Sequence, residues 1–181
     1  MKVIGGTLKG RNLFFLKNKN IRPTKDIVRE AVFDVLMGCV EGQKVLDLFA
    51  GTGSLGIEAA SRGAEEVVFV ESDYEAAKVI KKNLEQLSIA GICSIIRKNA
   101  EKALKDLEDA EFGLILADPP YEYKGKRIAD MMSSFAQYRI VKKGGIIVVE
   151  HERKNKIPAA EGFNFYKQKD YGRSCVSYFR Y

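Results

Sequence analysis

The chain has 181 residues, of which 46% are hydrophobic and 30% charged, a composition typical of one globular domain with a buried core. Three widely spaced cysteines and a single histidine exclude a disulfide framework, a zinc site and a histidine-based catalytic triad. Because no apolar run approaches ~20 residues and the amino end lacks a signal-peptide core, we expect a cytoplasmic protein without membrane association or metal.

The net charge of +6 is concentrated at the two ends of the chain. Residues 1–44 carry nine Lys and Arg against four acids, and residues 152–181 carry seven against three. Two basic flanks around a slightly negative centre suit a phosphate-bearing partner such as a nucleic acid. Ordinary solvated lysines explain the same charge equally well, so charge alone leaves both interpretations open.

The first 44 residues predict an extension followed by a helix. Residues 1–21 alternate short apolar stretches with glycines, which is typical of a hairpin or a loose β extension. Arg22-Pro23-Thr24 then opens a helix in which apolar residues recur at Ile27, Ala31 and Val35, and Gly38 or Gly42 ends it. We therefore expect an amino-terminal β-hairpin extension over 1–21 and the main domain over 22–181.

From residue 44 onward a strand, a turn and a helix repeat. Strands are predicted at 45–49, 67–70, 92–96, 112–117 and 146–150, and helices at 54–61, 74–87, 101–107 and 127–138. Two more β-like runs, 163–167 and 175–179, are joined by a turn at 170–173. This order predicts an α/β fold with a mostly parallel sheet, helices on both faces and an antiparallel terminal hairpin.

The segment Asp118-Pro119-Pro120-Tyr121 directly follows the apolar run 112–117. Two prolines lack backbone N–H groups and cannot continue a central strand, so the chain must turn at the strand's carboxyl end. Ligands of open α/β sheets bind at these strand ends. A fixed set of acceptors beside an aromatic ring suits a planar base with an exocyclic amine.

The loop after the first predicted strand has two interpretations. Gly51, Gly53 and Gly56 satisfy the G-x-G-x-x-G pattern, and Glu71 lies 20 residues after Gly51, as in dinucleotide-binding proteins. Asp47 argues against a pyrophosphate, because its carboxylate repels one. The same carboxylate suits a ligand with a cationic amine or sulfonium, such as S-adenosylmethionine (SAM), whose ribose Glu71 can hold. Glycines then let the backbone approach the ligand closely.

Polar residues follow four successive predicted strands. Asp47, Glu71, Asn99 and Asp118 stand at or just after the first to fourth strands of the parallel series. Asn99 either faces the adenine of a nucleoside ligand or is a simple turn residue, and the sequence favours neither. The carboxyl ends of parallel strands lie at one edge of a sheet, so we expect these side chains to converge on one crevice.

With these motifs, the chain resembles the class I SAM-dependent methyltransferases that modify amino groups, and more closely the RsmD-type guanine-N2 methyltransferases of bacterial small-subunit ribosomal RNA. The matching stretches span nearly the whole chain: Ile4-Gly5-Gly6, Lys9-Gly10-Arg11, Arg22-Pro23-Thr24, Val28-Arg29-Glu30-Ala31, Asp47 to Gly53, Ser61-Arg62-Gly63-Ala64, Asp118 to Tyr121, and Tyr171-Gly172. Asn99 departs from the family, in which many members carry Asp.

The resemblance implies a Rossmann-like fold and methyl transfer from SAM to a guanine amine in 16S rRNA or an assembled small subunit. We expect the protein to act as a monomer. The resemblance implies catalytic roles for Asp118, Pro119, Pro120 and Tyr121. It implies cofactor contacts for Asp47, Phe49, Ala50, Gly51, Thr52, Gly53, Glu71, Ser72, Asn99 and Ala100. An adenine-N6 methyltransferase, which shares the Asp-Pro-Pro-Tyr motif, a nicotinamide-dependent oxidoreductase and a non-enzymatic RNA-binding module remain as alternatives.

Several cations near the basic flanks are candidates for RNA phosphate contacts. They are Lys9, Arg11, Arg22, Lys25, Arg29 and Arg173. Arg29 has a second interpretation, because it can pair with Asp26 or Glu30 on its own helix or face solvent. His151 is interpreted as a structural residue.

Overall fold

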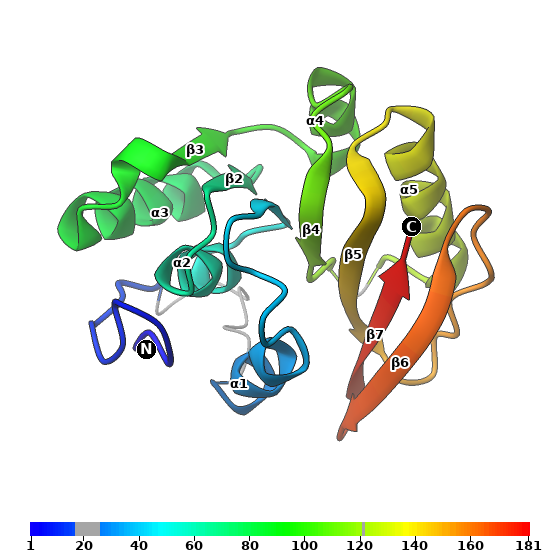
Figure 1. Cartoon of the computed structure of the whole chain (residues 1–181), viewed down its shortest axis with the longest axis horizontal. Helices are drawn as coiled ribbons and strands as arrows, with labels where there is room; N and C mark the ends of the chain where they lie inside the picture. Colours follow the sequence, from blue (N-terminus) through cyan, green and yellow to red (C-terminus); the bar gives the residue numbers. More distant parts are fainter. Residues whose placement is uncertain (17–25, 121) are drawn as a thin grey trace.

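The computed structural model of the chain describes residues 1–16, 26–120 and 122–181 (Figure 1). Within them, one mixed sheet has the strand order β3-β2-β1-β4-β5-β7-β6. The strands are β1 (Lys44–Leu48), β2 (Glu66–Val70), β3 (Cys93–Ile96), β4 (Phe112–Ala117), β5 (Val141–Glu152), β6 (Asn164–Tyr171) and β7 (Ser174–Arg180). The helices are α1 (Asp26–Val35), α2 (Ser54–Ser61), α3 (Tyr74–Leu87), α4 (Ala100–Asp106), α5 (Gly125–Gln137) and the 3-10 turn η1 (Ala90–Ile92).

The sheet has the predicted topology. Strands β1 to β5 pair in parallel, and β7 runs antiparallel between β5 and the edge strand β6. The chain order reverses at β1, where β2 lies on one side and β4 on the other. The carboxyl ends of β1 and β4 therefore border the crevice at which ligands of such sheets bind. The predicted fold class and the terminal hairpin are confirmed.

Two apolar cores, one on each face of the sheet, explain why the central strands read as continuous hydrophobic runs. All six residues of β4 are buried. Leu114 and Leu116 pack with residues of α1, α2 and α3, whereas Ile115 and Ala117 pack with residues of α4 and α5. Because both faces of β4 are covered, its sequence does not alternate between apolar and polar residues.

Most boundaries follow the sequence, and the start of β5 differs for an identifiable reason. The predicted helix 54–61 and strand 112–117 coincide with α2 and β4, and Asp73 caps α3 by accepting a hydrogen bond from the Ala76 N–H at 2.9 Å. Strand β5 begins five residues before the predicted 146, because Val141 already pairs with Phe112 across an irregularity in the register. In α1, Val28 and Val32 are buried, whereas Ile27 is 72% exposed.

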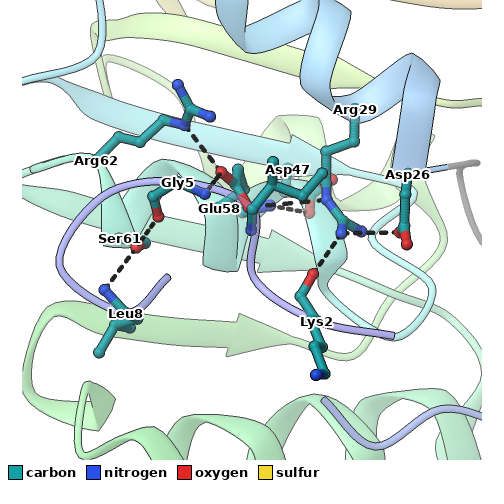
Figure 2. Close-up of polar contacts among 11 residues, drawn as sticks. Lys2, Gly5, Leu8, Asp26, Arg29, Asp47, Glu58, Ser61 and Arg62 are labelled. Atoms are coloured by element: carbon teal, nitrogen blue, oxygen red, sulfur yellow. Dashed lines mark hydrogen bonds and ion pairs between the residues drawn. The ribbon is translucent and has the colours of Figure 1, made fainter. Parts of the chain in front are cut away.

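The amino-terminal residues fold back on themselves and dock on α2 (Figure 2). Within residues 1–16 of the expected hairpin, one isolated antiparallel bridge joins Lys2 and Asn12. The buried Glu58 carboxylate of α2 accepts hydrogen bonds from the Ile4 and Gly5 N–H groups at 2.8 and 2.7 Å. Only glycine fits at position 6, where φ is +73° and a Cβ would lie 1.8 Å from the Ser61 carbonyl oxygen.

The boundary expected at 21/22 and the helix start at 22–24 lie outside the described residues. None of the described helices is long and apolar enough to cross a membrane.

Candidate active site

The carboxyl ends of the parallel strands β1 to β5 open into one cleft of about 1500 Å³. The cleft brings together most of the site residues that the sequence predicts. They are Asp47, Phe49, Ala50, Gly51, Thr52, Glu71, Ser72, Asn99, Ala100, Asp118, Pro119, Pro120 and Arg173. The polar residues after the four strands thus share one crevice, as expected. We call the side formed by the β1, β2 and β3 ends the cofactor half, and the side formed by the β4, β5 and β7 ends the acceptor half.

Gly53 is the predicted cofactor residue that does not line the cleft. It stands before α2 with a φ of +84°, and a Cβ there would lie 3.2 to 3.4 Å from buried side-chain atoms of Ile80, Phe69 and Ile57. Gly53 therefore allows the loop to turn into α2 and to pack closely against these side chains.

Glu71 fixes the glycine loop of the cofactor half. Its carboxylate oxygens accept hydrogen bonds from the Gly51 N–H and the Asp73 N–H, both at 2.7 Å. These two backbone donors hold the carboxylate against the loop. Each oxygen keeps a second lone pair, so the pinned carboxylate is still able to accept the hydroxyl groups of a ribose.

Asp47 lies beneath the same loop, with only 1% of its surface exposed. Its Oδ2 accepts a hydrogen bond from the Gly56 N–H at 2.8 Å. Burial raises the pKa of Asp47 to about 7, the hydrogen bond from Gly56 opposes this shift, and the charge of Glu71 adds to it. A cation bound in the cofactor half compensates this buried charge, whereas a pyrophosphate increases the repulsion.

Asn99 has a structural role that is visible in the fold. Its side-chain oxygen accepts a hydrogen bond from the Glu101 N–H at 2.9 Å and caps α4. The structural interpretation of Asn99 is therefore observed in the form of a helix cap, and its contact with adenine stays a prediction.

In the acceptor half, Asp118, Pro119 and Pro120 follow β4 at the cleft wall, and Tyr121 lies outside the described residues. The sequence reasoning missed much of the remaining wall of this half, namely Glu150, Glu152, Asn155, Tyr171 and Ser174. Glu150 carries the signal used for the other acids, because it ends the predicted strand 146–150. His151, predicted to be structural, also lines this wall, and its Nε2 lies 2.8 Å from the Ser177 Oγ.

Tyr123 is a second aromatic residue that the sequence reasoning missed. Its backbone N–H donates to the Pro120 carbonyl at 2.9 Å, which closes the turn after the two prolines. Its ring packs edge-on against the Phe49 ring, with the two ring centroids 5.0 Å apart, and the Arg127 guanidinium lies 3.8 Å from the centre of the Tyr123 ring. Arg127 and the Tyr123 hydroxyl both donate to Glu101. The signal was available, since Tyr123 stands two residues after Tyr121.

The predicted RNA contacts fall into three groups. Lys9 and Arg11 are exposed in the amino-terminal loop, and Arg173 is exposed at the cleft rim. Arg22 and Lys25 lie outside the described residues. Arg29 forms the third group.

Arg29 belongs to the core, and the prediction that it contacts RNA is wrong (Figure 2). Its side chain is fully buried and donates to the Lys2 carbonyl at 2.6 Å and to Asp26 at 3.0 Å. Glu58 lies 3.8 Å away as a second acidic partner. Burial lowers the pKa of Arg29, and the two acids oppose this shift. The contact with Asp26 is one of the alternatives considered from sequence. Arg29 is buried because it lies on the face of α1 that packs against the core.

Comparison with known proteins places the chain in a family. Residues 1–180 match the family described as conserved hypothetical protein 95. The chain belongs to this family. It is 36% identical to a candidate rRNA methyltransferase of Bacillus subtilis, YlbH, over 99% of this chain and 98% of that protein. It is 33% identical to the ribosomal RNA small subunit methyltransferase D of Haemophilus influenzae, over 98% of this chain and 91% of that protein.

Solved structures agree with the fold of this family. A candidate methyltransferase of Escherichia coli, yhhF, superposes with a TM-score of 0.86 at 28% identity, covering 99% of this chain and 97% of the other. An RNA methyltransferase of Salinibacter ruber, solved with S-adenosyl-L-homocysteine, superposes with a TM-score of 0.65 over 87% of this chain and 92% of the other. At 16% identity this second likeness concerns the fold alone.

Proposed function

We propose that this protein is a SAM-dependent methyltransferase that methylates the exocyclic N2 amine of a guanine in 16S rRNA of the small ribosomal subunit. The observation that carries the proposal is the single cleft in which the loop held by Glu71 faces the Asp118-Pro119-Pro120 turn. Membership of a family whose relatives include small-subunit rRNA methyltransferases supports the RNA substrate.

The residues of the cofactor half fit SAM. Glu71 is the acceptor we assign to the ribose hydroxyls, and Phe49 and Ala100 supply apolar surface beside the polar backbone of Gly51 and Thr52. When bound, SAM supplies an electrophilic methyl group on a positively charged sulfur. Asp47 lies beneath this half, and its ionised form favours a cationic ligand and disfavours the dinucleotide alternative.

The acceptor half fits a nucleobase amine. That amine is a poor nucleophile, because its lone pair is delocalised into the ring. We assign the Asp118 carboxylate and the Pro119 carbonyl as acceptors of its two N–H groups, which favours a tetrahedral nitrogen. The reaction breaks an S–C bond, forms an N–C bond and releases one proton from the nitrogen. Asp118 offsets the positive charge that develops on that nitrogen, and Tyr121 is proposed to stack on the base.

RNA binding is proposed for the amino-terminal extension, residues 1–21, beside the methyltransferase domain, residues 22–181. Lys9 and Arg11 present exposed cations there. We expect Lys9→Ala and Arg11→Ala each to reduce the slope of log affinity against log salt by about one. Lys126→Ala, on the exposed side of α5, serves as the charge-matched control with an unchanged slope.

The proposed function is tested by incubating the protein with methyl-labelled SAM and small subunits that lack the modification. Nucleoside analysis of the 16S rRNA is expected to place the label in N2-methylguanosine at one position. Label in N6-methyladenosine would favour the adenine alternative, and absence of transfer to 16S rRNA would overturn the proposal.

A further inference from the structure

Resting on the proposed function, we propose that Glu150 selects guanine by accepting the N1–H of the target base, beside the amine held at Asp118. The sheet register places these two acids as neighbours. Ala117 and Val149 are the last residues paired between β4 and β5, and Asp118 and Glu150 follow them directly. Adjacent parallel strands lie about 4.8 Å apart, so the two acidic residues begin side by side.

Both side chains belong to the same face of the sheet. Glu150 lines a small hollow together with Leu116, Val148 and Leu55, which places its side chain on the face covered by α1 and α2. Asp118 comes two residues after Leu116, and side chains two residues apart in an extended segment share a face. Both residues also line the large cleft. The strands that carry them lie next to each other in the sheet (Figure 1).

This pair of acceptors matches one purine and not the other. The base-pairing edge of guanine presents N1–H next to the 2-amine, so it offers adjacent donors. Adenine presents the unprotonated N1 next to its 6-amine. An ionised carboxylate is an acceptor only. Glu150, beside Asp118, therefore pairs with the guanine N1–H and repels the lone pair of the adenine N1.

The magnitude of the discrimination follows from the charge of the acceptor. A hydrogen bond to a charged group contributes roughly 1.5 to 3 kcal/mol, which corresponds to about 10-fold to 150-fold in kcat/KM. Selectivity rises further when the wrong base leaves a desolvated polar group without a partner. Glu150 thus determines specificity, whereas Asp118 acts on the reacting nitrogen.

The test replaces the target guanine in the small subunit by 2-aminopurine, which keeps the 2-amine but carries an acceptor at N1. We expect wild type to lose about 10-fold to 150-fold in kcat/KM on this substrate. In Glu150→Gln the side-chain amide donates to the acceptor N1, so the loss is expected to shrink to less than about threefold. Glu161→Gln, at an exposed acid outside the cleft, serves as the matched control and keeps the full wild-type loss.

The possible outcomes distinguish failure of the role of Glu150 from failure of the proposed function. Equal wild-type rates on guanine and 2-aminopurine would overturn the role of Glu150 without any variant. An unchanged loss in Glu150→Gln, in protein that binds SAM with wild-type affinity, would overturn it as well. If wild type transfers no methyl group to a guanine of 16S rRNA, the proposed function fails instead.

Discussion

The two halves of the cleft are held in place by different means. In the cofactor half, backbone N–H groups fix the acids, because Gly51 and Asp73 donate to Glu71 and Gly56 donates to Asp47. In the acceptor half, the Tyr123 N–H bond to Pro120 closes the turn after Asp118, and side chains also support it, because Tyr123 packs between Phe49 and Arg127. The acids of the cofactor half are fixed by bonds that form when the loop folds, whereas the acceptor-half turn also depends on side-chain contacts with the half-buried Phe49 and the exposed Arg127. We therefore expect SAM binding and methyl transfer to be separable by mutation.

The largest separation is expected from Asp118→Ala. Loss of the carboxylate removes an acceptor of the amine and the charge that stabilises the transition state, so we expect methyl transfer to fall by about 10²- to 10³-fold. SAM affinity, measured by calorimetry, should stay within about twofold of wild type, since the cofactor half keeps its residues. Asp130→Ala, an exposed acid of α5, controls for the change in charge. Near-normal turnover in Asp118→Ala would end the assigned role.

The converse separation is expected from Glu71→Ala. This variant removes the acceptor of the Gly51 N–H and the assigned acceptor of the ribose, so SAM affinity should fall by about 10- to 100-fold. At saturating SAM, the rate of transfer should fall much less than it does in Asp118→Ala. SAM affinity measured by calorimetry and single-turnover rates provide the two readouts. Unchanged affinity would remove Glu71 from the cofactor site.

Asp47→Asn is expected to stabilise the protein while weakening SAM binding. Native Asp47 keeps its proton up to about pH 7, whereas the unfolded chain releases it near 3.8. The folded state therefore binds more protons between these values, so wild-type stability falls as pH rises from about 4 to about 7 and remains lower above. The pKa shift corresponds to at most about 4 kcal/mol.

Melting temperatures of wild type and Asp47→Asn across pH separate the buried charge from the hydrogen bond. The amide oxygen of the variant still accepts from the Gly56 N–H, and the amide does not ionise. The variant should therefore melt at a higher temperature than wild type at pH 8 and at nearly the same temperature at pH 4. Parallel melting profiles for the two proteins would contradict the buried charge.

The smallest effect is expected from Tyr123→Phe. The ring contacts with Phe49 and Arg127 remain, and only the hydrogen bond from the hydroxyl to Glu101 is lost. A net loss of about 1 kcal/mol at most raises KM for the small subunit by no more than about fivefold and leaves SAM affinity unchanged. Tyr123→Ala removes the packing as well and should affect KM more strongly. Equal KM values in the two variants would show that the ring does not support the turn.

The sheet could be predicted from the sequence because each strand is defined by local signals. The run 112–117 is apolar and ends at two prolines, so β4 and the adjoining turn were identified without further information. The cleft followed from topology, since acids at the ends of parallel strands must share one edge.

The features that the sequence did not reveal depend on long-range contacts. Whether Arg29 faces solvent or the core depends on the docking of Lys2 and on Glu58 of α2, which local spacing does not report. Tyr123 gains its role from Phe49, which is distant in sequence. Glu150 ends the predicted strand 146–150, but only the β4–β5 register shows that its neighbour is Asp118.

The most direct test of the shared cleft is a crystal structure of the protein with S-adenosylhomocysteine. We predict that the ribose hydroxyls bind Glu71 and that the sulfur faces Asp118 across the cleft. A ligand bound outside this cleft, or a sulfur directed away from Asp118, would contradict this prediction.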